Sequence, residues 1–198
     1  MAPANRQALA PRQPPDRPAA EKICVAAMGR VPAVAPRVVA AHIHAFFGLP
    51  AEVLPGLPAP VYALDAGRMQ FDAGKIIQRL EGEAFPGCRK WIGVVEGDLF
   101  VPIFTYVLGE ARQGGRCALV SLCRLAQKDG PDASPQPTVL ERCAKVALHE
   151  LGHLFGIVHC PDPLCVMHIS GDVHELDQRR LALCRYCRRQ LDQRLCQP

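Results

Sequence analysis

The stretch HELGHLFGIVHC, which begins at His149, carries three histidines and one glutamate at fixed intervals. On a helix, His149 and His153 lie one turn apart on the same face, where two imidazoles can share one metal ion. Glu150 follows the first ligand directly and can reach a water on that metal. Gly156 can end the helix, so that the chain doubles back and brings His159 to the same ion.

This spacing predicts zinc chemistry. Three neutral imidazoles leave one position of a tetrahedral zinc open for water. The ion lowers the pKa of that water to roughly 7, and Glu150 then takes its proton and passes it to the leaving amine. The alternative is a core helix with incidental histidines. The full HExxHxxGxxH pattern favours the metal site, because the glycine has a geometric reason to stand where it does.

A second group of metal-ligating residues follows directly, as Cys160, Cys165, Cys184 and Cys187. A pair with one short spacing followed by a CxxC is typical of a tetrathiolate zinc site. Four thiolates would close the coordination shell, so this zinc is predicted to be structural. Four buried thiols or two disulfides are the alternatives. The other six cysteines stand in apolar contexts and are expected to be core thiols; they are Cys24, Cys88, Cys117, Cys123, Cys143 and Cys196.

The composition is that of a globular protein, with 49% hydrophobic and 21% charged residues in a chain of 198. Residues 1–20 contain five prolines and no apolar run, so we expect a flexible tail and not a signal peptide. No stretch approaches the apolar length of a membrane helix. We therefore expect a cytoplasmic protein that binds neither membrane nor nucleic acid.

Hydrophobic periodicity and turn residues divide the rest of the chain into alternating elements. The order predicts an α+β fold with a mixed sheet backed by helices. The expected strands cover residues 22–31, 51–56, 91–100, 103–111 and 117–125, and the expected helices cover 32–48, 71–83, 138–156 and 172–195.

The segments HELGHLFGIVHC, CVM and CRYC together resemble the archaemetzincin family of the metzincin clan, and the resemblance covers the whole chain after the tail. It implies a metzincin-like zincin: a mostly parallel twisted sheet, an active-site helix, a methionine turn and a C-terminal helix tied in by a second zinc. The three histidines carry over as catalytic zinc ligands, Glu150 as the general base and the four cysteines as structural zinc ligands. Met167 carries over as the turn methionine, although a lone methionine is more often core filler.

The resemblance also implies one catalytic domain over residues 21–198, with an upper part to about residue 156 and a lower part from 157. In metzincins an edge strand pairs with the extended substrate. That strand is expected here at Phe104, Thr105, Tyr106, Val107 and Leu108.

The sequence thus predicts a zinc metallopeptidase with two zinc ions per chain and a peptide substrate, acting on short peptides in an aminopeptidase-like way. A non-catalytic two-zinc module that only binds peptides is the alternative. Glu150 argues against it, since binding alone needs no base there. A nucleic-acid-binding zinc protein would explain the six arginines between Arg179 and Arg194, but it needs no HExxH and is expected to have a broader basic surface.

Overall fold

The computed structural model of the chain describes residues 22–83, 85–125 and 137–196. Its main sheet has five strands in the order β2-β1-β5-β8-β7. The first four strands run parallel to one another, and β7 pairs with β8 in antiparallel fashion at one edge. The prediction of a mixed, mostly parallel sheet is therefore confirmed. These strands are β1 (Lys22–Met28), β2 (Ala51–Val53), β5 (Cys88–Val95), β7 (Gly109–Ala111) and β8 (Cys117–Ser121).

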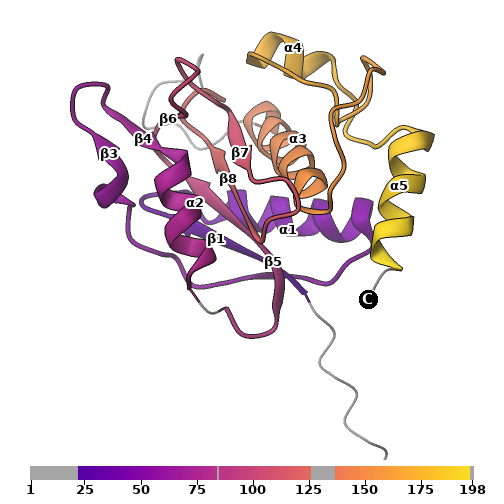
Figure 1. Ribbon diagram of the computed structural model, residues 1–198, viewed down its shortest axis with the longest axis horizontal. Coiled ribbons are helices and arrows are strands. Elements are labelled where there is room, and N and C mark those ends of the chain that lie inside the picture. The colour runs from indigo at the N-terminus through magenta and orange to yellow at the C-terminus, as the bar shows by residue number, and fades with distance from the viewer. Residues whose placement is uncertain (1–21, 84, 126–136, 197–198) are drawn as a thin grey trace, which may run out of the picture.

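Helices cover both faces of this sheet (Figure 1). Successive side chains of a strand point to opposite faces, so Ile23 packs with α1 (Val34–Phe47) and α3 (Pro137–Leu154), whereas Cys24 packs with α2 (Ala73–Glu81). A parallel sheet buried on both sides needs apolar residues at almost every position. The unbroken apolar runs of β1, β5 and β8 satisfy that requirement.

A smaller sheet of three short strands lies beside the main one, in the order β3-β4-β6. Strand β3 pairs with β4 in antiparallel fashion, and β4 pairs with β6 in parallel. A short 3-10 helix at Val61–Ala63 leads into it. The strands are β3 (Leu64–Asp65), β4 (Gln70–Asp72) and β6 (Leu99–Phe100).

The strand expected over residues 103–111 is wrong in its extent, because only Gly109–Ala111 pairs along β8. Before it, Val107 makes a single bridge to Leu99. The carbonyls of Phe104 and Thr105 accept hydrogen bonds from the side chain of Arg68 and so do not join a ladder. The aromatic and β-branched residues of this segment form an irregular wall and not a strand.

The single helix expected over residues 172–195 is also wrong. Two helices, α4 (Val173–Gln178) and α5 (Arg185–Leu195), are separated by a non-helical segment. That segment hydrogen-bonds to the preceding loop, since the Val166 amide donates to the Ala182 carbonyl and the Arg180 amide donates to the Leu164 carbonyl. Backbone pairing outside the helices thus interrupts a sequence that has helical periodicity throughout.

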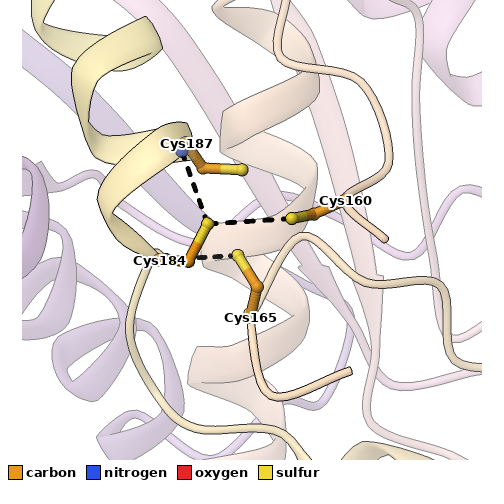
Figure 2. A group of neighbouring side chains, drawn as sticks. All are labelled: Cys160, Cys165, Cys184 and Cys187. Carbon is orange, nitrogen blue, oxygen red and sulfur yellow. Dashed lines mark hydrogen bonds between the residues drawn. The ribbon is translucent and has the colours of Figure 1, made fainter. Parts of the chain in front are cut away.

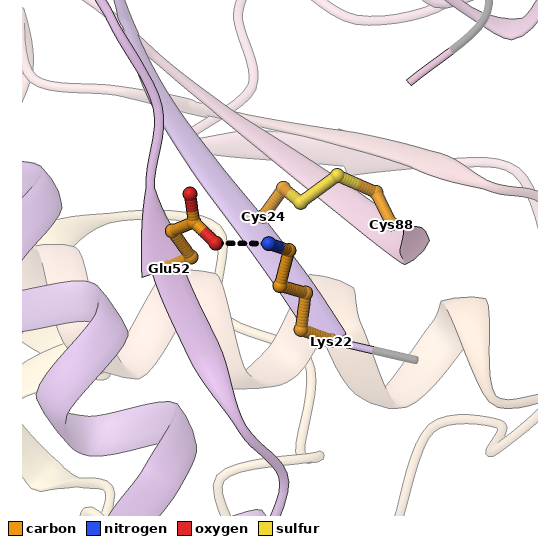
Figure 3. The surroundings of a disulfide bond; sticks show 4 residues. All are labelled: Lys22, Cys24, Glu52 and Cys88. Carbon is orange, nitrogen blue, oxygen red and sulfur yellow. Dashed lines mark hydrogen bonds and ion pairs between the residues drawn. A yellow bond between two sulfur atoms is a disulfide. The ribbon is translucent and has the colours of Figure 1, made fainter. Parts of the chain in front are cut away.

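The expectation of six core thiols fails for four of them. Cys24 in β1 and Cys88 at the start of β5 form a disulfide that joins two neighbouring parallel strands (Figure 3). Lys22 beside it pairs with Glu52 of β2, so three strands are tied together at this end of the sheet. Cys117 and Cys143 are buried free thiols as expected, whereas Cys123 and Cys196 are exposed.

The expected tail of residues 1–20 lies outside the described residues. In the described ranges, no helix has the length and apolar character needed to cross a membrane.

Candidate metal centre and active site

Helix α3 and the turn after it bring three histidines together. His149 and His153 lie one helical turn apart, with ring centroids separated by 4.6 Å. The chain then turns at Gly156, whose φ of 79° is a left-handed value that favours glycine. The turn places His159 with its ring centroid 5.2 Å from that of His149 and 4.9 Å from that of His153. One ring nitrogen from each histidine lies within 4.8 Å of the other two.

Backbone carbonyls fix which ring nitrogens of these histidines carry hydrogen. The Nδ1 atom of His149 lies 2.8 Å from the Val166 carbonyl oxygen, and that of His153 lies 2.8 Å from the Ile157 carbonyl oxygen. A carbonyl only accepts, so each Nδ1 must donate, and a neutral ring then has its lone pair on Nε2. The two Nε2 atoms face each other at 3.0 Å.

The electrostatics of this group match a cation. Burial lowers the pKa of His149 to about 3, with a further contribution from His153. Burial also lowers the pKa of His153 and of His159. The rings are therefore neutral near pH 7, and no proton is available to join the facing Nε2 atoms. Two lone pairs directed at each other repel unless a cation lies between them, so the donor set fits a metal ion.

Glu150 lies against the edge strand, with only 7% of its surface exposed. Room for it comes from Gly109 in β7. A methyl group on Gly109 would lie 2.8 Å from Glu150 Oε1 and 2.6 Å from Val146 Cγ1. Burial raises the pKa of Glu150, and the nearby Glu110 raises it further. A carboxyl group with a raised pKa is a stronger base, which suits proton transfer.

Met167 lies beneath the histidines, fully buried against α3. It can approach because residue 152 is glycine: a methyl group there would clash with the Met167 sulfur. The Met167 carbonyl accepts from the Cys160 amide, and the Cys160 carbonyl lies 2.7 Å from Nδ1 of His168. The turn at Met167 is thus connected by hydrogen bonds to the chain that follows His159.

A pocket of about 380 Å³ opens beside Glu150, and all five residues expected as a substrate strand, 104–108, lie along it. They form one wall of the pocket, and residues 168–171 also line it. His168 lines this pocket, and its Nδ1 forms a hydrogen bond with the Cys160 carbonyl. The remaining lining residues are Gly109, Val146, His149, Glu150, His159, Val166 and Leu176.

The free edge of β7 offers backbone groups to a peptide. The Ser121 amide donates to the Leu108 carbonyl, which sets the phase of the antiparallel ladder. Hydrogen-bonded pairs alternate along such a ladder, so Leu108 and Glu110 bond to β8. The backbone groups of Gly109 and Ala111 therefore point away from the sheet, toward the open edge.

The four cysteines of the second group also converge (Figure 2). Their sulfur atoms all lie within 4.8 Å of one another. Cys160 and Cys165 come from the loop after α3, Cys184 caps the start of α5, and Cys187 lies in its first turn. The Cys160 and Cys184 sulfurs are 3.7 Å apart, and the Cys184 amide donates to the Cys165 sulfur at 3.3 Å.

Burial disfavours charge on most of these thiols. It raises the pKa of Cys165 to about 11, and it raises the pKa of Cys187, to which Cys160 also contributes. Burial opposes ionisation of Cys184 too, but hydrogen bonds from the Cys187 amide and the Cys160 thiol lower the pKa of Cys184. Four thiolates can therefore lie together only around a cation, and the donor set fits zinc.

Comparisons with known proteins agree with this geometry. Residues 87–193 match the model of peptidase family M54. The archaemetzincin of Pyrococcus horikoshii is 35% identical over 156 residues, which span 77% of this chain and 82% of that protein. The chain belongs to the archaemetzincins of peptidase family M54. By that membership it is a metallopeptidase.

Solved structures of the family share the fold. The crystal structure of archaemetzincin from Methanopyrus kandleri is 32% identical, covers 96% of this chain with its whole length, and superposes with a TM-score of 0.78. A structure described as a zinc-dependent peptidase, from Methanocorpusculum labreanum, is 28% identical and has a TM-score of 0.76. It covers 85% of this chain and 99% of its own. The metzincin-like fold is thereby confirmed.

Sequence reasoning missed several residues that build this archaemetzincin site. Gly109 and Gly152 leave space for Glu150 and Met167, but a glycine in a sequence does not show what packs against it. The carbonyls of Val166 and Ile157, which orient two of the histidines, carry no side-chain signal at all. Gly156 is different, because its spacing from the histidines is itself the signal that predicts the turn.

Proposed function

We propose that this chain is a zinc-dependent peptidase whose zinc is held by His149, His153 and His159. The observation that carries the proposal is the pair of Nε2 atoms that face each other at 3.0 Å while both Nδ1 atoms are bound to carbonyls. Such carbonyl partners are typical of histidines that ligate a metal. His159 is exposed, so one side of the site is open to a substrate. The zinc dependence ascribed to the Methanocorpusculum labreanum peptidase supports zinc as the metal.

We propose a second, structural zinc on Cys160, Cys165, Cys184 and Cys187. Three of the four residues are buried, and four sulfur ligands leave no position for a substrate. The cluster joins the loop that follows His159 to helix α5, whose position would otherwise depend on few apolar contacts. A role in holding the C-terminal segment follows from that placement.

Each part of the site then has a task in peptide hydrolysis. A zinc ion held by His149, His153 and His159 would supply a Lewis acid that lowers the pKa of water and polarises a peptide carbonyl. Glu150, held between α3 and β7, takes a proton from the attacking water and delivers it to the leaving amine. Residues 104–108 and 168–171 enclose a side chain of the substrate in the pocket, whose lining is mainly apolar.

The peptide is proposed to bind in an extended conformation. Gly109 and Ala111 can add it to the sheet as a further antiparallel strand, because their backbone groups face the free edge of β7. Short peptides meet this requirement without unfolding. Comparing peptides with free and acetylated amino termini will show whether the action is that of an aminopeptidase.

The test is the variant Glu150→Gln, which keeps the shape of the side chain and removes its basicity. We expect two zinc ions per chain in both proteins and a loss of turnover of about 10²- to 10⁴-fold in the variant. Zinc content is measured by atomic emission and turnover on a random peptide pool. If the unaltered chain binds peptides and two zinc ions but releases no cleavage products, the non-catalytic module replaces this proposal.

A further inference from the structure

The wall of the pocket formed by residues 104–108 has no regular secondary structure over most of its length, but it makes several specific contacts with segments distant in the sequence. Phe104 and Ile103 are exposed, so burial of apolar side chains does little to fix the first part of this wall. The contacts that hold it are polar, and they come from the small sheet and from the ends of β5 and β8. The peptide-hydrolysis mechanism assigns no role to these groups.

Gln70 of β4 lies at the centre of these contacts. It is 7% exposed, and all the polar atoms of its side chain are used. Its Nε2 donates to the Thr105 carbonyl at 2.9 Å and to Asp98 Oδ2 at 2.7 Å, while its Oε1 accepts from Arg68 Nε at 2.8 Å. An amide is the group this position needs, because it must donate twice and accept once.

Arg68 adds a second hold on the same backbone. Its guanidinium donates to the Thr105 carbonyl at 2.8 Å and to the Phe104 carbonyl at 3.2 Å, and it lies 4.1 Å above the ring of Phe100. Two successive carbonyls of the wall are therefore occupied by side chains of the β3–β4 hairpin.

Asp98 and Arg124 complete the group. Asp98 accepts from Arg124 Nε at 2.8 Å and from Arg124 Nη2 at 2.6 Å, a two-point ion pair that fixes the direction of both side chains. The guanidinium of Arg124 lies 3.8 Å above the ring of Tyr106, the next residue of the wall. Side chains from three different parts of the chain thus meet at residues 104–106.

We propose that Gln70 is a positioning residue for substrate binding: with Arg68, Asp98 and Arg124, it holds the wall of residues 104–106 in the shape that receives the peptide. The inference rests on the proposed function of the cleft. Its effect falls on KM and not on the chemical step, because a preformed wall strengthens the binding of ground state and transition state alike.

The test compares Gln70→Leu and Gln70→Glu with the unaltered chain, all loaded with zinc. Gln70→Leu removes all three hydrogen bonds. Gln70→Glu keeps the size of the side chain but places a carboxylate beside Asp98 and the Thr105 carbonyl, so both hydrogen bonds donated by Gln70 are lost. For both variants we expect KM for peptide substrates to rise about tenfold, with kcat within about twofold and zinc content unchanged. Amide hydrogen exchange at residues 104–108 should become faster.

The matched control is Glu81→Gln. Glu81 is also largely buried and forms an ion pair with Arg112 away from the pocket, and the substitution weakens that pair. It should leave KM unchanged. Three outcomes would overturn the inference. KM stays constant in both Gln70 variants, or kcat and zinc content fall in these variants as well, or the control variant raises KM by the same factor. Failure of the unaltered chain to cleave peptides would refute the proposed function alone. Hydrogen exchange still decides the inference then, since unchanged exchange in Gln70→Leu overturns it without any turnover.

Discussion

The histidine and cysteine groups are joined by the single peptide bond between His159 and Cys160, and yet they differ in almost every physical respect. The histidine group offers three donors, one of them exposed, and adjoins a pocket of about 380 Å³. The cysteine group offers four donors, three of them buried, with hydrogen bonds from amides of its own segment. The two groups thus differ in access to solvent and in the number of donors, which supports the proposal of a catalytic metal on the histidines and a structural one on the cysteines.

The two groups also depend on different supports. His149 and His153 are oriented by backbone carbonyls that lie beyond the end of α3, at Val166 and Ile157. Val166 lies beside Cys165, so the loop that the cysteines hold also orients a histidine. We therefore expect disruption of the cysteine cluster to disturb the orientation of His149, whereas loss of metal from the histidines should leave the cysteine cluster intact.

Chelation should show the largest difference between the two groups. A mild chelator should remove the zinc on the histidines first, because that ion has three protein ligands and an open side, and activity should be lost completely. The proposed zinc on the cysteines should remain bound, and the chain should stay folded. The measurement is zinc content and circular dichroism after dialysis against increasing chelator. Unfolding that accompanies the first loss of zinc would show that the division into two kinds of site is wrong.

A methyl group at Gly109 should affect the histidine side alone. In Gly109→Ala the added carbon meets Glu150 Oε1 at 2.8 Å, so the carboxylate must move. We expect kcat/KM to fall about 100-fold, the effect typical of a catalytic group misplaced by about 1 Å, while both zinc ions stay bound. Kinetics and zinc content are measured together.

The control for that substitution is Gly56→Ala, where the nearest atom to the added methyl group is a carbonyl oxygen at an ordinary 3.8 Å. It should leave kcat/KM within about twofold of the unaltered value. Loss of zinc in Gly109→Ala would contradict the assignment of this glycine to Glu150.

The same contrast explains what the sequence can predict. Ligand types and spacings are local, so residues 149–187 alone predict both metal-ligating groups, the active-site helix and Met167. The buried parallel strands are predictable because their apolar runs have no other use in a globular chain. Residues 104–108 line the pocket, but the strand expected there is wrong. The Thr105 carbonyl accepts hydrogen bonds from Gln70 and Arg68, which are about 35 residues away, and such distant partners leave no local signal.

Long-range pairing accounts for the other errors. Residues 179–184 are not helical. Arg180 and Ala182 hydrogen-bond to Leu164 and Val166, and periodicity cannot reveal such partners. The pairing of Cys24 with Cys88 follows from the neighbouring positions of β1 and β5 in the sheet, 64 residues apart in sequence. The network around Gln70 is hidden for the same reason, because a single glutamine before a helix carries no local signal.

The smallest predicted effect concerns the ion pair that joins α3 to α4. Arg142 of α3 donates to Asp177 of α4 through Nε at 2.7 Å and Nη2 at 2.6 Å. The hydrogen bonds from Arg142 lower the pKa of Asp177 in the folded chain. A lowered folded-state pKa stabilises the fold above the unfolded-state value, and this contribution is lost as pH falls through the folded-state pKa.

Asp177→Asn should therefore reduce the free energy of unfolding by about 0.5–1 kcal/mol at pH 7, a small value because the Asp177 side chain is 40% exposed and screened by solvent. The difference between the variant and the unaltered chain should shrink as pH falls below about 4. Denaturant titrations at pH 7 and pH 3 measure it, with Glu83→Gln, in a looser exposed pair with Arg79, as the control. Zinc content should not change at either group, since the pair joins α3 to α4 without contacting a ligand side chain. A variant that lost zinc from the histidines would show that α4 supports the histidine site directly.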